Sequence, residues 1–106
     1  MILDGSVKYA RMARQAIVEN DVQAAHNNLV KVQNIYAELM ATLDTNAGKW
    51  AKDIFTIYTY IHKELREINM KKDLERMDAI MPLIEQVREI WHEAYKETLK
   101  TKPTNK

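Results

Sequence analysis

Three histidines and one serine are the side chains best suited to metal binding or catalysis in this sequence: His26, His62, His92 and Ser6. Glu89 and His92 have the Glu-x-x-His spacing of di-iron bundles, which place carboxylates and histidines on facing helices. Such a site needs this motif twice and a glutamate from each of two other helices, whereas here the motif occurs once. We therefore expect His92 to be an ordinary histidine beside the core, and we expect no metal site.

Phosphotransfer and nucleophilic catalysis find equally little support. A phosphotransfer helix needs an exposed histidine with a nearby lysine and a glycine that lets the partner approach. His26 is followed by Lys31, but residues 22–43 contain no glycine. Ser6 falls in the first turns of a helical segment, and nothing resembles a Gly-rich phosphate loop or a nucleophile elbow. The sequence predicts a protein that is not an enzyme and needs no cofactor. A structural four-helix module and a metal or phosphotransfer bundle remain the alternatives.

Composition excludes several other classes of function. Sixteen basic and fifteen acidic residues are mixed along the chain and leave a formal charge of +1, so we expect no nucleic-acid partner. No apolar run approaches the roughly 20 residues that span a bilayer, and no signal peptide is recognisable. The absence of cysteine excludes disulfides and thiolate zinc sites. These features predict a cytoplasmic protein with no membrane insertion.

Four helical segments must position these residues, because apolar residues recur every three or four positions throughout the chain. We expect helices at Ile2–Val18, Val22–Leu43, Lys49–Ile68 and Leu74–Leu99. Connections of only a few residues force neighbouring helices to be antiparallel. The predicted fold is an all-α, antiparallel up-down four-helix bundle. It forms a single domain at residues 1–100, followed by a disordered tail at 101–106.

Polar residues mark where these helices begin and end. Asp21 and Asp73 are suitable N-caps, and Asn69 can take the left-handed conformation that ends a helix. Pro82 removes one backbone hydrogen bond in the last segment. Because the apolar pattern continues through Pro82, we expect a kink there and not a break.

The second and third segments carry more apolar residues than one core-facing stripe needs. The residues expected in the core include Trp50, Ile54, Ile61, Leu65, Ile84 and Trp91. Off these stripes lie Val30, Ile35 and Met40 in the second segment, and Phe55 and Tyr58 in the third. Such a surplus forms either a wider core or a surface for a partner.

Gly5 is unusual because glycine inside a helix is about 1 kcal/mol less favourable than alanine. A helix keeps glycine readily where another backbone comes close. We therefore expect a tight helix–helix or partner contact at Gly5. The neighbouring Asp4 should accept hydrogen bonds from a loop or helix start.

The order of several short motifs resembles the flagellin-specific export chaperones of the FliS family. The matching stretches, in chain order, are Ile2-Leu3-Asp4-Gly5-Ser6, Leu43-Asp44 through Gly48, Ile57-Tyr58-Thr59-Tyr60, Asp73, and Val87-Arg88-Glu89-Ile90-Trp91. Each motif is short, but together they run with the family's spacing from Ile2 to about Ala94. The chain departs from the pattern at Leu3, where the family has tyrosine. Residues corresponding to the family's N-terminal arm are absent from this sequence.

The resemblance implies a passive chaperone that binds the disordered C-terminal segment of flagellin. The client would fold as helices around the bundle, which prevents premature polymerisation in the cytoplasm and presents flagellin to components of the flagellar export apparatus. The family's N-terminal arm partly covers the client groove, so its absence predicts an open groove. The residues expected to bind the client are Ile2, Leu3, Val30, Ile35, Met40, Phe55 and Tyr58.

Overall fold

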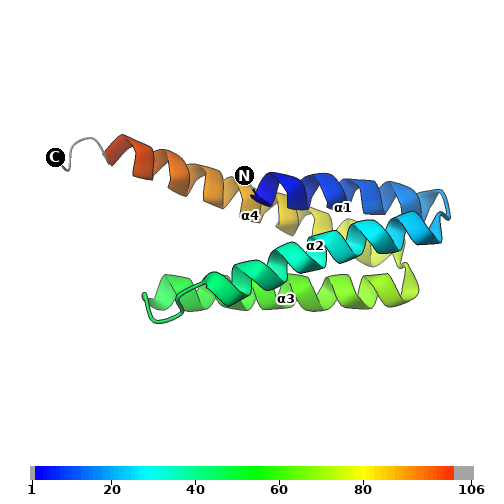
Figure 1. The fold of residues 1–106 in the computed structure, drawn as a ribbon, viewed down its shortest axis with the longest axis horizontal. Coiled ribbons are helices and arrows are strands. Elements are labelled where there is room, and N and C mark those ends of the chain that lie inside the picture. The colour runs from blue at the N-terminus through cyan, green and yellow to red at the C-terminus, as the bar shows by residue number, and fades with distance from the viewer. Residues whose placement is uncertain (1, 102–106) are drawn as a thin grey trace.

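Apolar residues at helical spacing fold the chain into four helices joined by short turns (Figure 1). The computed structural model describes the backbone of residues 2–101 and the side chains of residues 2–94. The helices are α1 (Ile2–Val18), α2 (Val22–Thr42), α3 (Lys49–Lys71) and α4 (Leu74–Thr101). Residues 2–101 contain no strand, and the all-α prediction is therefore confirmed.

The N-terminal caps of two helices are as predicted, and one C-terminal cap is not. A side-chain oxygen of Asp21 accepts a hydrogen bond of 3.1 Å from a backbone N–H in the first turn of α2. Asp73 does the same for α4 at 3.2 Å. The prediction that Asn69 ends α3 is wrong, because the helix continues past it. Lys72 takes the left-handed conformation instead, with φ 52°. The three residues Asn69 to Lys71 thus add nearly one turn to α3.

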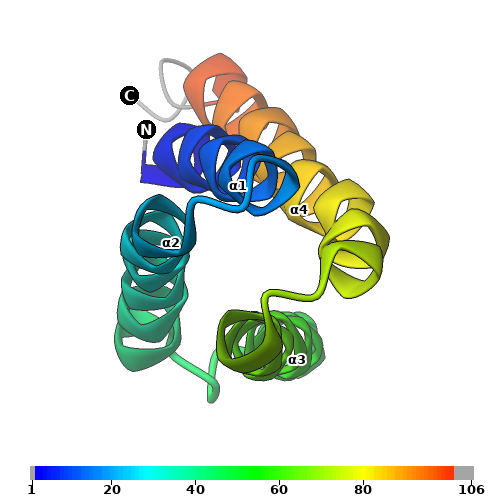
Figure 2. The same cartoon turned by 90° about the vertical axis from the view of Figure 1, so that its right-hand side faces the viewer.

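The helices run alternately up and down, as the short connections require (Figure 1). Helices α1 and α3 each pack against both α2 and α4, and this closes a ring of four helices. Figure 2 shows this ring from the end that carries the α1–α2 and α3–α4 turns. The predicted antiparallel up-down four-helix bundle is therefore confirmed.

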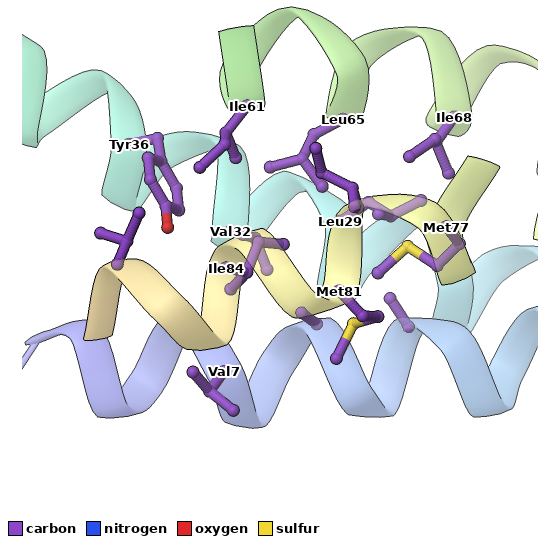
Figure 3. Packing of buried hydrophobic residues seen from close by; sticks show 14 of the residues in the cluster. Val7, Leu29, Val32, Tyr36, Ile61, Leu65, Ile68, Met77, Met81 and Ile84 are labelled. Carbon is purple, nitrogen blue, oxygen red and sulfur yellow. The ribbon is translucent and has the colours of Figure 1, made fainter. Parts of the chain in front are cut away.

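The core lies along the axis of this ring, where aliphatic side chains from all four helices interdigitate (Figure 3). Ile61, Leu65 and Ile84 are fully buried, as predicted. Ile54 and Trp91 are only partly buried and pack on the edge of the core. The predicted burial of Trp50 is wrong, because 56% of its surface is exposed. The reason is the separation of α3 from α4 near this residue, which is described below.

Helix α4 is the longest of the four helices and continues through Pro82 without a break, as expected. Pro82 is exposed, so the crowding caused by its ring falls on the solvent side of the helix. The disordered tail predicted at 101–106 lies outside the described residues except for Thr101, the last residue of α4. In the described part of the chain, no helix is long and apolar enough to cross a membrane.

Candidate functional site

Helices α3 and α4 lie close together at the turn that joins them and separate toward their other ends (Figures 1 and 2). Near the turn, Glu64 on α3 and Arg76 on α4 form an ion pair of 3.1 Å. Farther along, the contact passes to longer side chains: the indole Nε1–H of Trp91 donates a hydrogen bond of 2.6 Å to the Tyr58 hydroxyl. These two aromatic side chains bridge the widening gap between the helices.

The side of α3 that faces α4 can be followed from this ion pair toward the N-terminus of α3. Ile57 and Trp50 lie seven and fourteen residues before Glu64, so they lie on the same side of the helix. Ile57 is partly buried, whereas Trp50 is 56% exposed. The α4-facing side of α3 is therefore apolar and increasingly open toward its beginning.

Helix α4 presents a matching side. Leu83 and Ile90 lie seven and fourteen residues after Arg76, so they face α3. Leu83 is partly buried on the core, and Ile90 is 47% exposed. We call the surface formed by Trp50, Ile57, Leu83 and Ile90, together with the partly buried Trp91, the α3/α4 face.

An exposed tryptophan on α3 and an exposed isoleucine on α4, each on the side of its helix that leads to the other helix, suit a binding surface for an apolar partner. Isolated exposed apolar residues are common, but contiguous apolar patches mark interaction sites. Tryptophan is also the residue most enriched among those that dominate binding energies. Sequence reasoning missed this surface because Trp50 continues the core pattern of α3, and the pattern does not reveal where the neighbouring helix turns away.

Two buried tyrosines continue inward from Trp91 of the α3/α4 face. The rings of Tyr36 and Tyr58 meet edge to face, with centroids 5.7 Å apart. Burial raises the pKa of both hydroxyls, and the hydrogen bond from Trp91 partly offsets this for Tyr58. The Tyr36 hydroxyl is buried near Ser6 but makes no hydrogen bond within the described residues. Both tyrosines therefore remain neutral. Their rings pack as apolar groups, and only their hydroxyls are polar.

Two of the residues expected to bind a client, Leu3 and Tyr58, are buried in the core. Leu3 is 2% exposed and Tyr58 is 1% exposed, so neither can lie on an open groove. Tyr58 thus takes the wider-core position that the sequence left open, and Leu3 is likewise a core residue. Leu3 lies one turn before Val7 on the inward side of α1, and Tyr58 packs against Tyr36 across the core. The surplus apolar pattern at Tyr58 thus reflects a wider core.

Ile2 and Ile35 lie on the seam between α1 and α2. Ile2 is 44% exposed and Ile35 is partly buried. A Cβ atom added to Gly5 would lie 3.8 Å from Ile35 Cδ1 and 3.8 Å from a ring carbon of Tyr9. These are ordinary van der Waals distances to side chains, so the tight helix–helix contact predicted at Gly5 is not present. Beside Ile35, the ammonium group of Lys31 lies 4.7 Å from the centre of the Tyr9 ring.

Val30, Met40 and Phe55 belong to a different seam, between α2 and α3. The hydroxyl of Thr59 lies 3.4 Å from the Met40 sulfur, which fixes the register of the two helices. Phe55 precedes Thr59 by one turn on the same side of α3 and is 36% exposed. Val30 and Met40 are partly buried. The expected client residues are therefore divided between two seams and the core, and do not form one groove.

Asp4 joins α1 to α4 through two side chains of α4, whereas we expected donors from a neighbouring loop or helix start. Its Oδ1 accepts hydrogen bonds from Arg88 Nε at 2.6 Å and from His92 Nε2 at 3.2 Å. The hydrogen bond from Arg88 is the largest influence and lowers the pKa of Asp4 from 3.8 to about 2. Desolvation opposes this effect, and the weaker hydrogen bond from His92 adds to it. The Asp-Gly motif of α1 thus holds the helix against the middle of α4.

The histidines have separate surroundings. The His26 ring contacts the Asn69 amide, His92 contacts Asp4, and His62 is partly buried on α3. The carboxylate of Glu89, the other half of the Glu-x-x-His motif, lies 3.1 Å from Arg88 Nη1. Among the described residues, no three His, Asp or Glu side chains are grouped as metal ligands would be.

Comparison with known proteins identifies the family. A model of the family described as flagellar protein FliS matches residues 1–98. The flagellar secretion chaperone FliS of Bacillus subtilis (strain 168) is 31% identical over 94 residues, which cover 89% of this chain and 70% of the Bacillus protein. The four helices fit this match in extent, since it includes all of α1 to α3 and most of α4. This chain therefore belongs to the FliS family of flagellar proteins.

Proposed function

We propose that this protein is a flagellar export chaperone that binds the disordered C-terminal segment of flagellin. Bound to this segment, it keeps flagellin monomeric in the cytoplasm and presents it to the export apparatus. Membership of the FliS family and the similarity to a flagellar secretion chaperone support the chaperone role. The observation that carries flagellin binding is the exposed α3/α4 face.

The mechanism is binding alone. An amphipathic client helix lays its apolar side chains against an apolar surface of the bundle. Ordering a disordered segment costs about 2–5 kcal/mol, which the burial of apolar area must exceed. At about 25 cal/mol per Å², roughly 200 Å² of apolar surface offsets the upper figure. Trp50 and Ile90 supply part of this area on the α3/α4 face.

The α1/α2 seam, with Ile2 and Ile35, and the α2/α3 seam, with Val30, Met40 and Phe55, are proposed as further contacts of the same client. A flexible client segment can follow more than one seam, because disordered partners wrap large surfaces. The α3/α4 face is the principal site in this proposal, since it combines the exposed tryptophan with helices that already stand apart.

One charge placed on each surface tests the assignment. The variants are Ile90→Glu on the α3/α4 face, Phe55→Glu on the α2/α3 seam and Ile2→Glu on the α1/α2 seam. All three side chains are at least 36% exposed, so the fold should be retained. Each variant is titrated calorimetrically with a flagellin C-terminal peptide, and its helix content is checked by circular dichroism.

Wild-type protein should bind the peptide and increase the total helix content, and Ile90→Glu should weaken binding most. A folded Ile90→Glu protein with undiminished affinity would remove the α3/α4 face from the site. If the wild-type protein does not bind the peptide, the proposed function itself is wrong.

A further inference from the structure

The α2/α3 seam changes from apolar to polar along its length. At one end lie Met40 and Phe55, and farther toward the α3–α4 turn the seam opens into a groove of about 460 Å³. This groove is lined by His26, Gln33, Arg66, Glu67, Asn69 and Met70. None of the client contacts proposed so far lies in this groove, and its polar lining differs from the apolar surfaces.

One side chain of this groove, Gln33, has a buried hydrogen-bond donor, its side-chain nitrogen, without a partner among the described residues. Buried amide N–H groups in folded proteins nearly always have a partner, because the loss of hydration is otherwise not compensated. Because this nitrogen has almost no exposed surface, the Gln33 side chain must turn toward the groove to reach an acceptor, and an acceptor supplied by a bound molecule would then provide this compensation.

The lining of the groove carries one arginine, Arg66, and one glutamate, Glu67. The Arg66 guanidinium is exposed. Burial lowers the pKa of His62, one turn earlier on α3, and the positive charge of Arg66 lowers it further. Glu67, the acidic residue of the lining, lies 3.9 Å from Arg76 Nη1 on α4. A group that accepts hydrogen bonds and carries negative charge therefore fits between Gln33 and Arg66. A carboxylate has both properties, and arginine binds it with two parallel donors.

The distance between the two ends of the seam determines how far apart the apolar residue and the carboxylate must lie in the sequence of a partner helix. Met40 and Gln33 are seven residues apart on α2, which corresponds to about 10 Å along a helix axis. A partner helix lying in the seam has the same rise. If one of its apolar side chains packs against Met40 and Phe55, the residue seven positions away reaches Gln33 and Arg66.

We propose that the α2/α3 seam selects a client helix in which an Asp or Glu lies about seven residues from an apolar anchor, with the carboxylate bound by Gln33 and Arg66. This inference rests on the proposed binding of the flagellin C-terminal segment and adds a polar specificity element to it. The occupant is one acidic side chain of that segment.

A double-mutant cycle tests the contact. Each Asp or Glu of the flagellin C-terminal peptide is replaced in turn by Asn or Gln, and each peptide is titrated against wild-type protein and against Arg66→Gln and Gln33→Leu. The control is Lys52→Gln, which removes one exposed positive charge from the same helix at a distance from the groove. Circular dichroism confirms that all variants are folded.

Arg66→Gln should weaken binding about tenfold, as expected for a hydrogen bond to a charged group, and Lys52→Gln should have little effect. One acidic position of the peptide should lose affinity toward wild-type protein but not toward Arg66→Gln, and an apolar residue should lie about seven positions from it. If no acidic position is coupled to Arg66 while Ile90→Glu still weakens binding, this inference is overturned and the proposed function stands. A peptide that binds neither wild-type protein nor any variant overturns both.

Discussion

Replacement of Trp50 by alanine tests whether this residue belongs to the core or to a binding surface. A buried tryptophan at this position would make Trp50→Ala cost about 3–5 kcal/mol of stability. The indole is instead 56% exposed at the start of α3, so the substitution should change the free energy of unfolding by only about 0.5–1 kcal/mol. The melting temperature should therefore fall by no more than roughly 4–8 °C.

The same substitution should strongly affect client binding. A tryptophan side chain can bury about 250 Å², and an exposed fraction of 56% leaves roughly 140 Å² for a partner to cover. At about 25 cal/mol per Å², complete coverage contributes about 3.5 kcal/mol, which is roughly 300-fold in Kd. Calorimetric titration with a flagellin C-terminal peptide measures this change.

Val22→Ala is the matched control, because Val22 is 62% exposed at the opposite end of the bundle, where α2 begins. Its affinity for the peptide should equal that of the wild-type protein.

Two results would refute the reasoning. A Trp50→Ala protein that unfolds would mean that Trp50 is core, and a folded one with wild-type affinity would mean that the α3/α4 face is not the client site.

Three further predictions concern stability, each checked by thermal melting followed by circular dichroism. Gly5→Ala should stabilise the protein by about 0.5–1 kcal/mol, because a Cβ fits there at ordinary distances; a lower melting temperature would contradict this. Ile84→Ala, at a fully buried position, should cost about 2–5 kcal/mol, and a loss below 1 kcal/mol would mean that the core repacks there. Asp4→Asn should destabilise the protein at pH 7, because the folded-state pKa of Asp4 is depressed to about 2, mainly by Arg88. Its stabilising effect is present above the unfolded-state pKa of 3.8 and is lost as the pH falls toward 2, so the two melting temperatures should converge in that window; a constant difference would exclude the ion pair as the cause.

Local chemistry made most of the fold predictable from the sequence. Helical periodicity located all four helices, and the carboxylates of Asp21 and Asp73 located two of their starts. The end of α3 was missed because Asn69 and Lys72 can both take the left-handed conformation, and the choice depends on how far the helix continues to pack. Turn residues alone do not contain that information.

The candidate site was harder to predict, because it depends on the directions of whole helices. Trp50 and Ile61 continue the same apolar stripe, yet only Ile61 is buried, since α4 diverges from α3 before it reaches Trp50. Conversely, Tyr58 lies off the stripe and still packs in the core, where it accepts a hydrogen bond from Trp91 and contacts the ring of Tyr36. Periodicity identifies the side of a helix that is apolar, but not the length over which a neighbour covers it.

The chaperone role itself is tested most directly by seeded flagellin polymerisation followed by light scattering. Added at a one-to-one ratio to flagellin, the wild-type protein should suppress polymer growth, and suppression should not increase further with excess protein. The folded Ile90→Glu variant should suppress growth much less, because its charge lies on the α3/α4 face. Polymer growth at the same rate with and without the folded wild-type protein would contradict the proposal that this chain holds flagellin monomeric.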